Sequence, residues 1–404
     1  MSQVYDAIVV GARCAGSPTA MLLARRGYRV LLVDKATFPS DTMSTHIIHP
    51  PGVAALERWG LLERLDATGC PSFDRYSMDF GPLTIAGSLR PADGIGRSRC
   101  PRRIVLDKLL ADAAVEAGAE LREGFIVDEI LAEDGRVTGI RGHARGGASV
   151  TERARIVIGA DGRHSLLAKT VDAPRYNEQP PLQAGYYAYW SGVPVDGFEI
   201  FSREYRGFAA APTHDGLTMV VGGVPQAEFG SFKKDVESNF MAMLDLAPEF
   251  GERVRAGTRE ERFVGTADLP NFFRKPYGDG WALVGDAGYH KDPITAQGIS
   301  DAFRDAEALA EGIDATFTER IEFGVALAAY QRARDEHVLP IYGFTLDFAT
   351  LEPPPAEMQQ LFGAMRGNQD AMDDFVSVIA GTVSAAQFFA PDNTGAIMAA
   401  GTPA

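Results

Sequence analysis

The start of the chain contains a local pattern that few folds can accommodate. Residues 7–10, Ala-Ile-Val-Val, are an uninterrupted apolar run, which predicts a strand buried on both faces. A turn containing Gly11 and Gly16 follows, and then a helix-forming stretch over residues 20–26. Residues 29–33 form a second apolar strand pattern. Strand, glycine turn, helix and strand within about thirty residues predict a βαβ unit and therefore a parallel sheet.

Further segments extend this α/β pattern along the chain. The turn signal Asp134-Gly135 lies between two short apolar runs and predicts a hairpin. Apolar positions at helical spacing predict helices, and short apolar runs predict strands. We expect helices over residues 105–117 and 300–312, and strands around residues 125–127, 137–140, 156–158 and 281–284.

The residue composition changes between about residues 182 and 263, where the chain is rich in aromatic and β-branched residues and is interrupted by glycines. This predicts an antiparallel sheet inserted between two parts of the α/β domain. A proline-rich break at residues 350–355 precedes two amphipathic helices that begin near Met358 and Met372, and we expect a frayed tail over residues 395–404. The predicted domains are residues 1–175 with 275–340, residues 176–274, and residues 341–404.

Composition excludes several classes of function. Asp and Glu outnumber Lys and Arg by 54 to 39, a net charge of −15, so we expect no nucleic-acid partner. Cys14, Cys70 and Cys100 form no pair with metal-site or redox spacing, which suits a reducing cytoplasm. His46 and His49 are spaced like a metal pair, but no third ligand is near in sequence, and we expect no metal. We identify no signal peptide and no apolar run long enough for a membrane span.

The turn Gly11-Ala12-Arg13-Cys14-Ala15-Gly16 joins the first strand to the first helix, where amide groups and the helix dipole favour a dinucleotide pyrophosphate. Asp34 ends the second strand, a position from which a carboxylate can bind an adenosine ribose. Arg13 occupies the middle glycine position, so we expect its side chain to point away and to hold an anion or a nearby carboxylate. By itself the turn is also compatible with an α/β protein that binds no nucleotide.

Two later segments complete a set of three motifs in order. Gly159-Ala160-Asp161-Gly162 follows one predicted strand, and Gly285-Asp286 follows another and leads through Pro293 to Gly298-Ile299 at the start of a helix. Together with Arg102-Arg103-Ile104-Val105-Leu106-Asp107, these segments resemble the para-hydroxybenzoate hydroxylase-like (class A) flavoprotein monooxygenases. That superfamily includes the geranylgeranyl reductases and the flavin-dependent halogenases. The resemblance covers roughly residues 1–175 and 275–340.

The resemblance implies a Rossmann-like FAD-binding domain, bound FAD, and NADPH or NADH as reductant. The residues implied in FAD binding are Gly11, Arg13, Cys14, Ala15, Gly16, Asp34, Lys35, Thr45, Arg103, Val127, Asp161, Asp286, Gly298 and Ile299. Pro293, His290 and Lys291 are expected beside the reacting face of the flavin, the last two as acid or electrostatic groups. Asp161 could instead be a turn residue, Asp286 a helix cap, and Arg103 or Lys291 a solvated charge, while Cys14 could simply pack.

The choice among flavin reactions depends on smaller signals. The tryptophans Trp59, Trp190 and Trp281 cannot form the Trp-x-Trp-x-Ile-Pro element of the halogenases, and residues 187–190 match the reductase motif only faintly. We therefore expect a hydroxylase that acts with O2 on a small aromatic substrate, in a cytoplasmic monomer or homodimer. A reductase or dehydrogenase and a non-catalytic flavin-binding protein remain alternatives. Tyr187, Tyr189 and Phe208 are the candidate substrate contacts, although each could be core of the sheet.

Overall fold

The predicted βαβ unit is present at the start of the chain. In the computed structural model, which describes residues 4–401, β1 (Tyr5–Val10) and β2 (Val30–Val33) pair in parallel, and α1 (Gly16–Arg25) connects them. All four residues of β2 are buried, as expected for a strand covered on both faces.

The first sheet extends on both sides of this unit. On one side β1 pairs in parallel with β10 (Ser149–Gly159), which pairs in parallel with β20 (Trp281–Leu283), and β19 (Tyr277–Gly278) forms the antiparallel edge. On the other side β2 pairs with β7 (Glu120–Arg122). This doubly covered, mostly parallel sheet confirms the predicted α/β class.

The hairpin predicted at Asp134-Gly135 is present and is longer than expected. It joins β8 (Phe125–Glu133) to β9 (Arg136–Ala144), which then pairs with β10. Both turn residues have positive φ, 49° for Asp134 and 81° for Gly135, which is the conformation of a tight two-residue hairpin.

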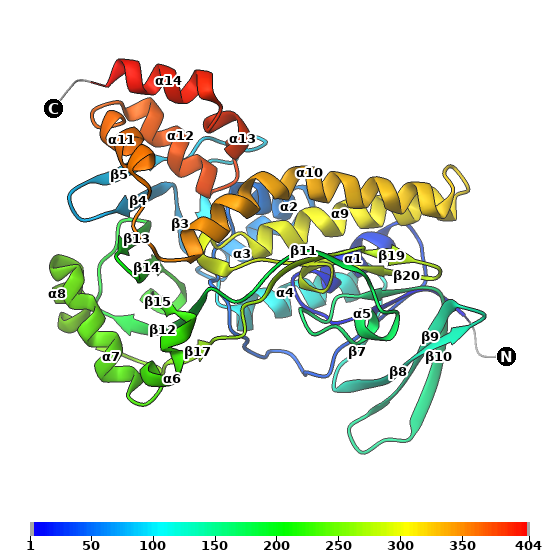
Figure 1. The fold of residues 1–404 in the computed structure, drawn as a ribbon. Coiled ribbons are helices and arrows are strands. Elements are labelled where there is room, and N and C mark those ends of the chain that lie inside the picture. The colour runs from blue at the N-terminus through cyan, green and yellow to red at the C-terminus, as the bar shows by residue number, and fades with distance from the viewer. Residues whose placement is uncertain (1–3, 402–404) are drawn as a thin grey trace.

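The predicted insertion is a second sheet whose members are mostly antiparallel. Its strands, in spatial order, are β16 (Thr258–Arg259), β12 (Gln183–Ser191), β15 (Thr218–Pro225), β14 (Arg206–Pro212), β13 (Phe198–Arg203), β4 (Arg75–Asp79) and β5 (Thr84–Ser88), with β17 (Val264–Thr266) also on β12. One face packs against α6 (Phe229–Phe232), α7 (Val236–Met243) and α8 (Pro248–Ala256). The opposite face is turned toward the rest of the molecule (Figure 1).

Helices cover the first sheet and the far side of the second (Figure 1). The remaining helices are α2 (Pro50–Arg58), α3 (Leu62–Asp66), α4 (Arg103–Glu116), α5 (Leu166–Thr170), α9 (Gly298–Phe317), α10 (Phe323–Ala349), α11 (Ala356–Ala364), α12 (Gln369–Ile379), α13 (Ala385–Phe388) and α14 (Pro391–Ala400). The short elements are β3 (Ser72–Phe73), β6 (Ser98–Arg99), β11 (Arg175–Gln179), β18 (Asn271–Arg274), β21 (Tyr289–His290) and the 3₁₀ turns η1 (His214–Gly216), η2 (Gln226–Glu228), η3 (Leu244–Leu246), η4 (Gly285–Ala287) and η5 (Pro293–Thr295).

The C-terminal region corrects one expectation. Residues 391–400 form α14 instead of the frayed tail predicted from residue 395, because Ile397 is buried in the core shared with α11 and α12. Residues 402–404 lie outside the described part of the chain. Figure 1 shows α11 to α14 gathered beside β4 and β5.

Two elements cross the predicted domain divisions. The β4–β5 hairpin comes from the first 175 residues but pairs with β13 of the inserted sheet. Helix α10 runs from Phe323 to Ala349 and so spans the division placed at residue 340. The three-part division remains a prediction. The inserted sheet is built from two distant parts of the chain.

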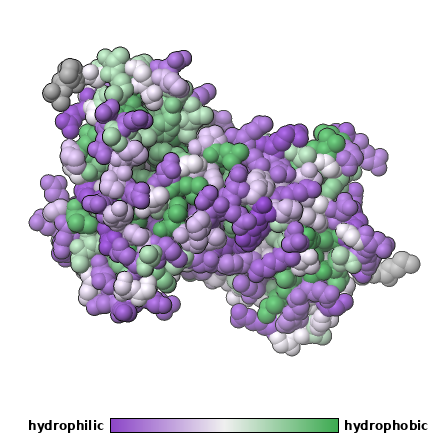
Figure 2. All heavy atoms as spheres, in the orientation of Figure 1, coloured by the Kyte–Doolittle hydropathy of each residue, from purple (hydrophilic) through white to green (hydrophobic). Residues whose placement is uncertain are grey.

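Figure 2 shows hydrophilic residues over most of the visible face, with hydrophobic residues in separate small groups. Within residues 4–401, we find no helix with the length and apolar character needed for a membrane span.

Candidate cofactor and substrate site

The three sequence motifs meet at the carboxyl ends of β1, β10 and β20. The Ala160 amide donates to the Val10 carbonyl at 2.8 Å, and Gly11, at a φ of 104°, lies so close to Ala160 that a Cβ would overlap its carbonyl oxygen. A Cβ on Gly285 would lie 2.7 Å from the Ala15 Cβ. Because these contacts leave no room for a side chain, Gly11 and Gly285 are needed to bring the motifs together.

Two helices begin at this junction with no side chain capping them. The N-cap residues, Ala15 of α1 and Gln297 of α9, make no side-chain hydrogen bond to the first turn. A Cβ on Gly16 would overlap the Gly11 carbonyl, so the turn before α1 is packed onto the helix start. The uncapped first-turn amides of α1 and of α9, which starts at Gly298 and Ile299, fit the anionic pyrophosphate and the flavin of FAD respectively.

Asp34 fastens the glycine turn to the end of β2. Its Oδ2 accepts from the Ala12 amide at 2.7 Å and its Oδ1 from the Ala36 amide at 2.8 Å. The Phe125 amide of β8 donates to the Asp34 carbonyl at 2.8 Å, which places Val127 two residues further along β8. The adjacent Lys35 is exposed. These contacts fix the carboxylate where β1, β2 and β8 meet.

The Arg13 side chain turns away from the turn and pairs with Asp107 of α4, whose carboxylate is fully buried. Arg103 also donates to this carboxylate, with bonds of 2.9 and 3.1 Å. Arg103 is itself buried, so it is not the solvated charge considered from the sequence. The Asp286 carboxylate interacts electrostatically with Arg103, so the two guanidiniums are balanced by two acids.

Cys14 and Asp161 have packing and capping roles beside this cluster. The Cys14 thiol lies 3.4 Å from Asp107, and burial raises its pKa well above its usual range, which keeps it a neutral thiol. Asp161 caps α5 by accepting from the Leu166 amide at 2.7 Å. Its Oδ1 is buried without a partner among the described residues, and burial raises the pKa of this carboxyl.

His290 and Lys291, the two predicted acid or electrostatic groups, follow η4, and both side chains are bound to other parts of the protein. His290 pairs with the Pro270 carbonyl through Nδ1. Lys291 is buried and donates to Asp301 of α9 at 2.7 Å, so it is not the solvated lysine considered from the sequence. Burial lowers the pKa of Lys291. Neither side chain lines the cavity described below, whereas Pro293 does.

Sequence reasoning missed Asp292, which lies between these residues. Its side chain is fully buried, and its Oδ1 accepts from the Ile294 amide at 3.0 Å and from Gln183 Nε2 at 2.5 Å. Burial raises the pKa of Asp292 to about 7. An Asp before a Pro is a common helix start, and this signal predicts the cap to Ile294 but not the partner on β12.

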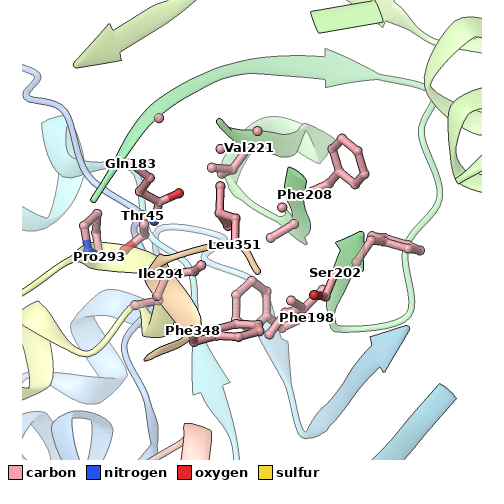
Figure 3. A pocket seen from close by; sticks show the side chains of 18 of the residues that line it. Thr45, Gln183, Phe198, Ser202, Phe208, Val221, Pro293, Ile294, Phe348 and Leu351 are labelled. Carbon is pink, nitrogen blue, oxygen red and sulfur yellow. The ribbon is translucent and has the colours of Figure 1, made fainter. Parts of the chain in front are cut away.

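A cavity opens between the inserted sheet and the segment that begins at Pro293. Its empty space, counted together with the open solvent at its mouth, is about 690 Å³. Figure 3 shows Gln183, Thr45 and Pro293 together at one end and Phe208 and Ser202 at the other. Its lining consists of Thr45, Gln183, Gly185, Phe198, Ile200, Phe201, Ser202, Gly207, Phe208, Ala209, Met219, Val221, Gly222, Gly223, Leu269, Pro293, Ile294, Ala296, Phe348 and Leu351.

Strand β12, which contributes Gln183 and Gly185 to the cavity, also carries Tyr187 and Tyr189. These two tyrosines lie outside the cavity. Both are buried, and their rings pack against the His46 ring, whose Nε2 pairs with the Tyr189 hydroxyl. Burial lowers the pKa of His46 to about 3, so this imidazole is neutral at physiological pH. Arg102 stacks over Tyr189 at 4.4 Å. The two tyrosines thus fix the loop containing His46 onto the sheet.

Comparison with known proteins identifies the kind of site. A 1H-pyrrole-2-carbonyl-(peptidyl-carrier protein) brominase from Pseudoalteromonas luteoviolacea is 25% identical over 329 residues, 77% of this chain and 78% of that protein. A 6-methylpretetramide 4-monooxygenase from Streptomyces rimosus is 28% identical over 340 residues, 76% of each chain. The solved structure of a myxobacterial chondrochloren halogenase superposes with a TM-score of 0.81 at 20% identity, covering 100% of this chain and 98% of that one.

A family described as FAD binding domain matches residues 4–341, which include all three motifs and the inserted sheet. The glycine contacts, the two uncapped helix starts and the buried acid–arginine cluster lie within this range. The chain therefore belongs to the FAD binding domain family and, with its motifs in the order of the class A flavoproteins, to that superfamily of FAD-dependent oxidoreductases.

Proposed function

We propose that the protein is an FAD-dependent monooxygenase that uses NADPH or NADH and O2 to hydroxylate a small aromatic molecule. The observation that carries the proposal is the cavity beside Pro293, whose lining is apolar apart from a few hydroxyl and amide groups. Small-molecule sites commonly combine an apolar wall with a small number of polar groups that fix orientation.

Bound FAD would supply the chemistry: it would take a hydride from the reductant and reduce O2, one atom of which would enter the substrate while the other leaves as water. The chain's own residues would hold and shield the reactants. The amides at Ala15 and Gly16 would bind the pyrophosphate, Asp34 the adenosine ribose, Asp286 the ribityl chain, and the first turn of α9 the flavin edge. The other proposed FAD contacts are Gly11, Arg13, Cys14, Lys35, Thr45, Arg103, Val127 and Asp161.

Pro293 would fix the chain direction beside the flavin, and the apolar lining would exclude water from it. Lys291 and His290 would act only indirectly, through the field of the Lys291–Asp301 pair and through the position of the 289–293 segment. Phe208 would act on the substrate only through the cavity wall, because its ring packs on the opposite face of the sheet in the core beneath α6–α8. Tyr187 and Tyr189 would act by holding the His46 loop.

The brominase among the relatives makes halogenation the competing reaction. The absence of the Trp-x-Trp-x-Ile-Pro element, with tryptophans at positions 59, 190 and 281, favours hydroxylation. The test is product analysis by mass spectrometry in ¹⁸O2, with NADPH or NADH and phenolic compounds, with and without bromide. One ¹⁸O in the product supports the proposal. A brominated product, or a saturated double bond formed without oxygen, would replace it with a halogenase or a reductase.

A further inference from the structure

Three neighbouring strands carry a glycine at the same level of the inserted sheet. Gly185 of β12 is directly opposite Gly223 of β15, and Gly223 is directly opposite Gly207 of β14. Residues that are directly opposite in neighbouring strands point to the same face of a sheet. All three line the cavity, so a band of bare backbone forms part of its wall.

The three glycines differ in which atoms occupy the space where a Cβ would lie. A Cβ on Gly207 would lie 3.1 Å from the Leu351 side chain, and a Cβ on Gly223 would overlap Gln183 Oε1. Above Gly185, the nearest atom to a Cβ would be a backbone oxygen at 4.0 Å. Gly185 therefore leaves a flat, unoccupied surface in the cavity, and the Gln183 amide over Gly223 lies between this surface and Leu351 over Gly207.

The Gln183 amide is held in one orientation. Its Nε2 donates to Asp292 Oδ1, and that oxygen also accepts from the Ile294 amide. The amide oxygen of Gln183 is thus left in the cavity over Gly223, where it can accept a hydrogen bond from a ligand. Figure 3 shows this oxygen directed toward the centre of the cavity.

The lining carries no ionisable side chain among the described residues. A carboxylate or ammonium group on a ligand would lose its hydration there without gaining an opposite charge. The cavity wall therefore disfavours charged ligands, and the bare backbone at Gly185 makes closer contact with a flat ring system than with a puckered one.

We propose that the cavity selects flat, uncharged aromatic molecules that bear a hydroxyl group. The ring system lies on the backbone at Gly185, and its hydroxyl donates to Gln183 Oε1. This inference rests on the proposed function only in taking the cavity as the substrate site, because it concerns binding and not turnover.

The test uses FAD-loaded protein without reductant and measures dissociation constants by calorimetry for matched probes. 2-Naphthol is the flat, neutral donor, decahydro-2-naphthol is its thick analogue, 2-naphthoate is its charged analogue, and 2-methoxynaphthalene lacks the donor. Farnesol represents a flexible isoprenoid chain. We expect 2-naphthol to bind at least tenfold more tightly than each of the others.

Variants locate the binding surface. Gly185→Ala should weaken 2-naphthol binding several-fold and Gly185→Leu at least tenfold, because each side chain enters the empty space. Gly343→Leu is the matched control, because Gly343 is exposed on α10 with no atom within 4 Å of its Cβ position. Gln183→Met should remove the preference for 2-naphthol over 2-methoxynaphthalene. FAD content and circular dichroism confirm that each variant is folded.

The wild-type probe series is decisive even if a variant does not fold. Failure of 2-naphthol to bind, or equal binding of decahydro-2-naphthol, 2-naphthoate or farnesol, would overturn the inference. Unchanged binding by folded Gly185→Leu would overturn it as well. If 2-naphthol binds as expected but no aromatic compound is ever oxygenated, the proposed function fails and the inference on ligand shape stands.

Discussion

The buried carboxyl of Asp292 makes a quantitative prediction about stability. Burial raises its pKa from 3.8 to about 7 in the folded protein. Between these two values the folded state holds a proton that the unfolded chain releases, so the free energy of unfolding falls as the pH rises. Above about pH 7 the group is ionised in both states and the loss is complete. A shift of about three pH units corresponds to about 4 kcal/mol.

The perturbation is Asp292→Asn, which keeps an oxygen for Gln183 and Ile294 but cannot ionise. Relative to the variant, the wild type should lose about 3 kcal/mol of stability between pH 5 and pH 8, which is the part of the titration in that window. For a chain of 404 residues, the Tm of the wild type should therefore fall by about 3 °C relative to that of the variant over this pH range. The prediction concerns only how the difference in Tm between the wild type and the variant changes with pH. The substitution also changes the free energy of unfolding by an amount that does not depend on pH.

The measurement is thermal unfolding followed by circular dichroism and by release of flavin fluorescence, at half-unit steps from pH 5 to pH 8. Asp134→Asn is the control for removal of one carboxylate, because Asp134 is exposed in the β8–β9 turn, where Asn tolerates the positive φ. A difference in Tm between wild type and Asp292→Asn that stays constant within about 1 °C over this range would refute the reasoning.

Three further predictions concern the FAD junction and its supports. Asp286→Ala should raise the Kd for FAD about 10- to 100-fold, measured by titrating apoprotein, and an unchanged Kd would show that Asp286 is only a helix cap. Asp301→Asn leaves Lys291 buried without its acid and should cost about 3–5 kcal/mol, whereas Lys291→Met should cost far less; equal losses of Tm would contradict the pairing. Arg13→Gly should retain FAD but lower Tm and alter the rate of flavin reduction, because Asp107 loses one of its two arginine partners. Tighter FAD binding with unchanged kinetics would mean that Arg13 is a tolerated substitution.

The parallel sheet could be predicted because its signals are local. The apolar runs of β1, β10 and β20 end at or near a glycine and that of β2 ends at Asp34, and the order of the runs sets the topology once right-handed crossovers are assumed. The β4–β5 hairpin could not be assigned in this way. It pairs with β13, more than a hundred residues later, and nothing in its own sequence specifies that partner. The end of the chain was misjudged for a related reason, since the helicity of α14 depends on burying Ile397 against distant elements.

Within the site, residues that belong to a local sequence motif could be predicted, and residues whose properties depend on distant parts of the chain could not. Gly11, Asp161 and Asp286 belong to contiguous motifs, so their positions at the junction follow from the strands that precede them. Asp292 acquires its character from Gln183, 109 residues earlier in the chain, and from complete burial. No local pattern can report either property.

The aromatic residues of the inserted sheet show how strand register and a neighbouring loop determine which side chains line the cavity. Gln183, Gly185, Tyr187 and Tyr189 alternate onto one face of β12, so all four could have lined a substrate site. The loop through His46 covers the end of the strand where the tyrosines lie and leaves the Gly185 end open beside Pro293. A strand rich in tyrosine therefore contributes its glycine and its amide to the cavity, while its largest rings hold the loop in place. Aromatic content predicts that such a face is buried, and only the neighbouring loop determines which part of it can receive a ligand.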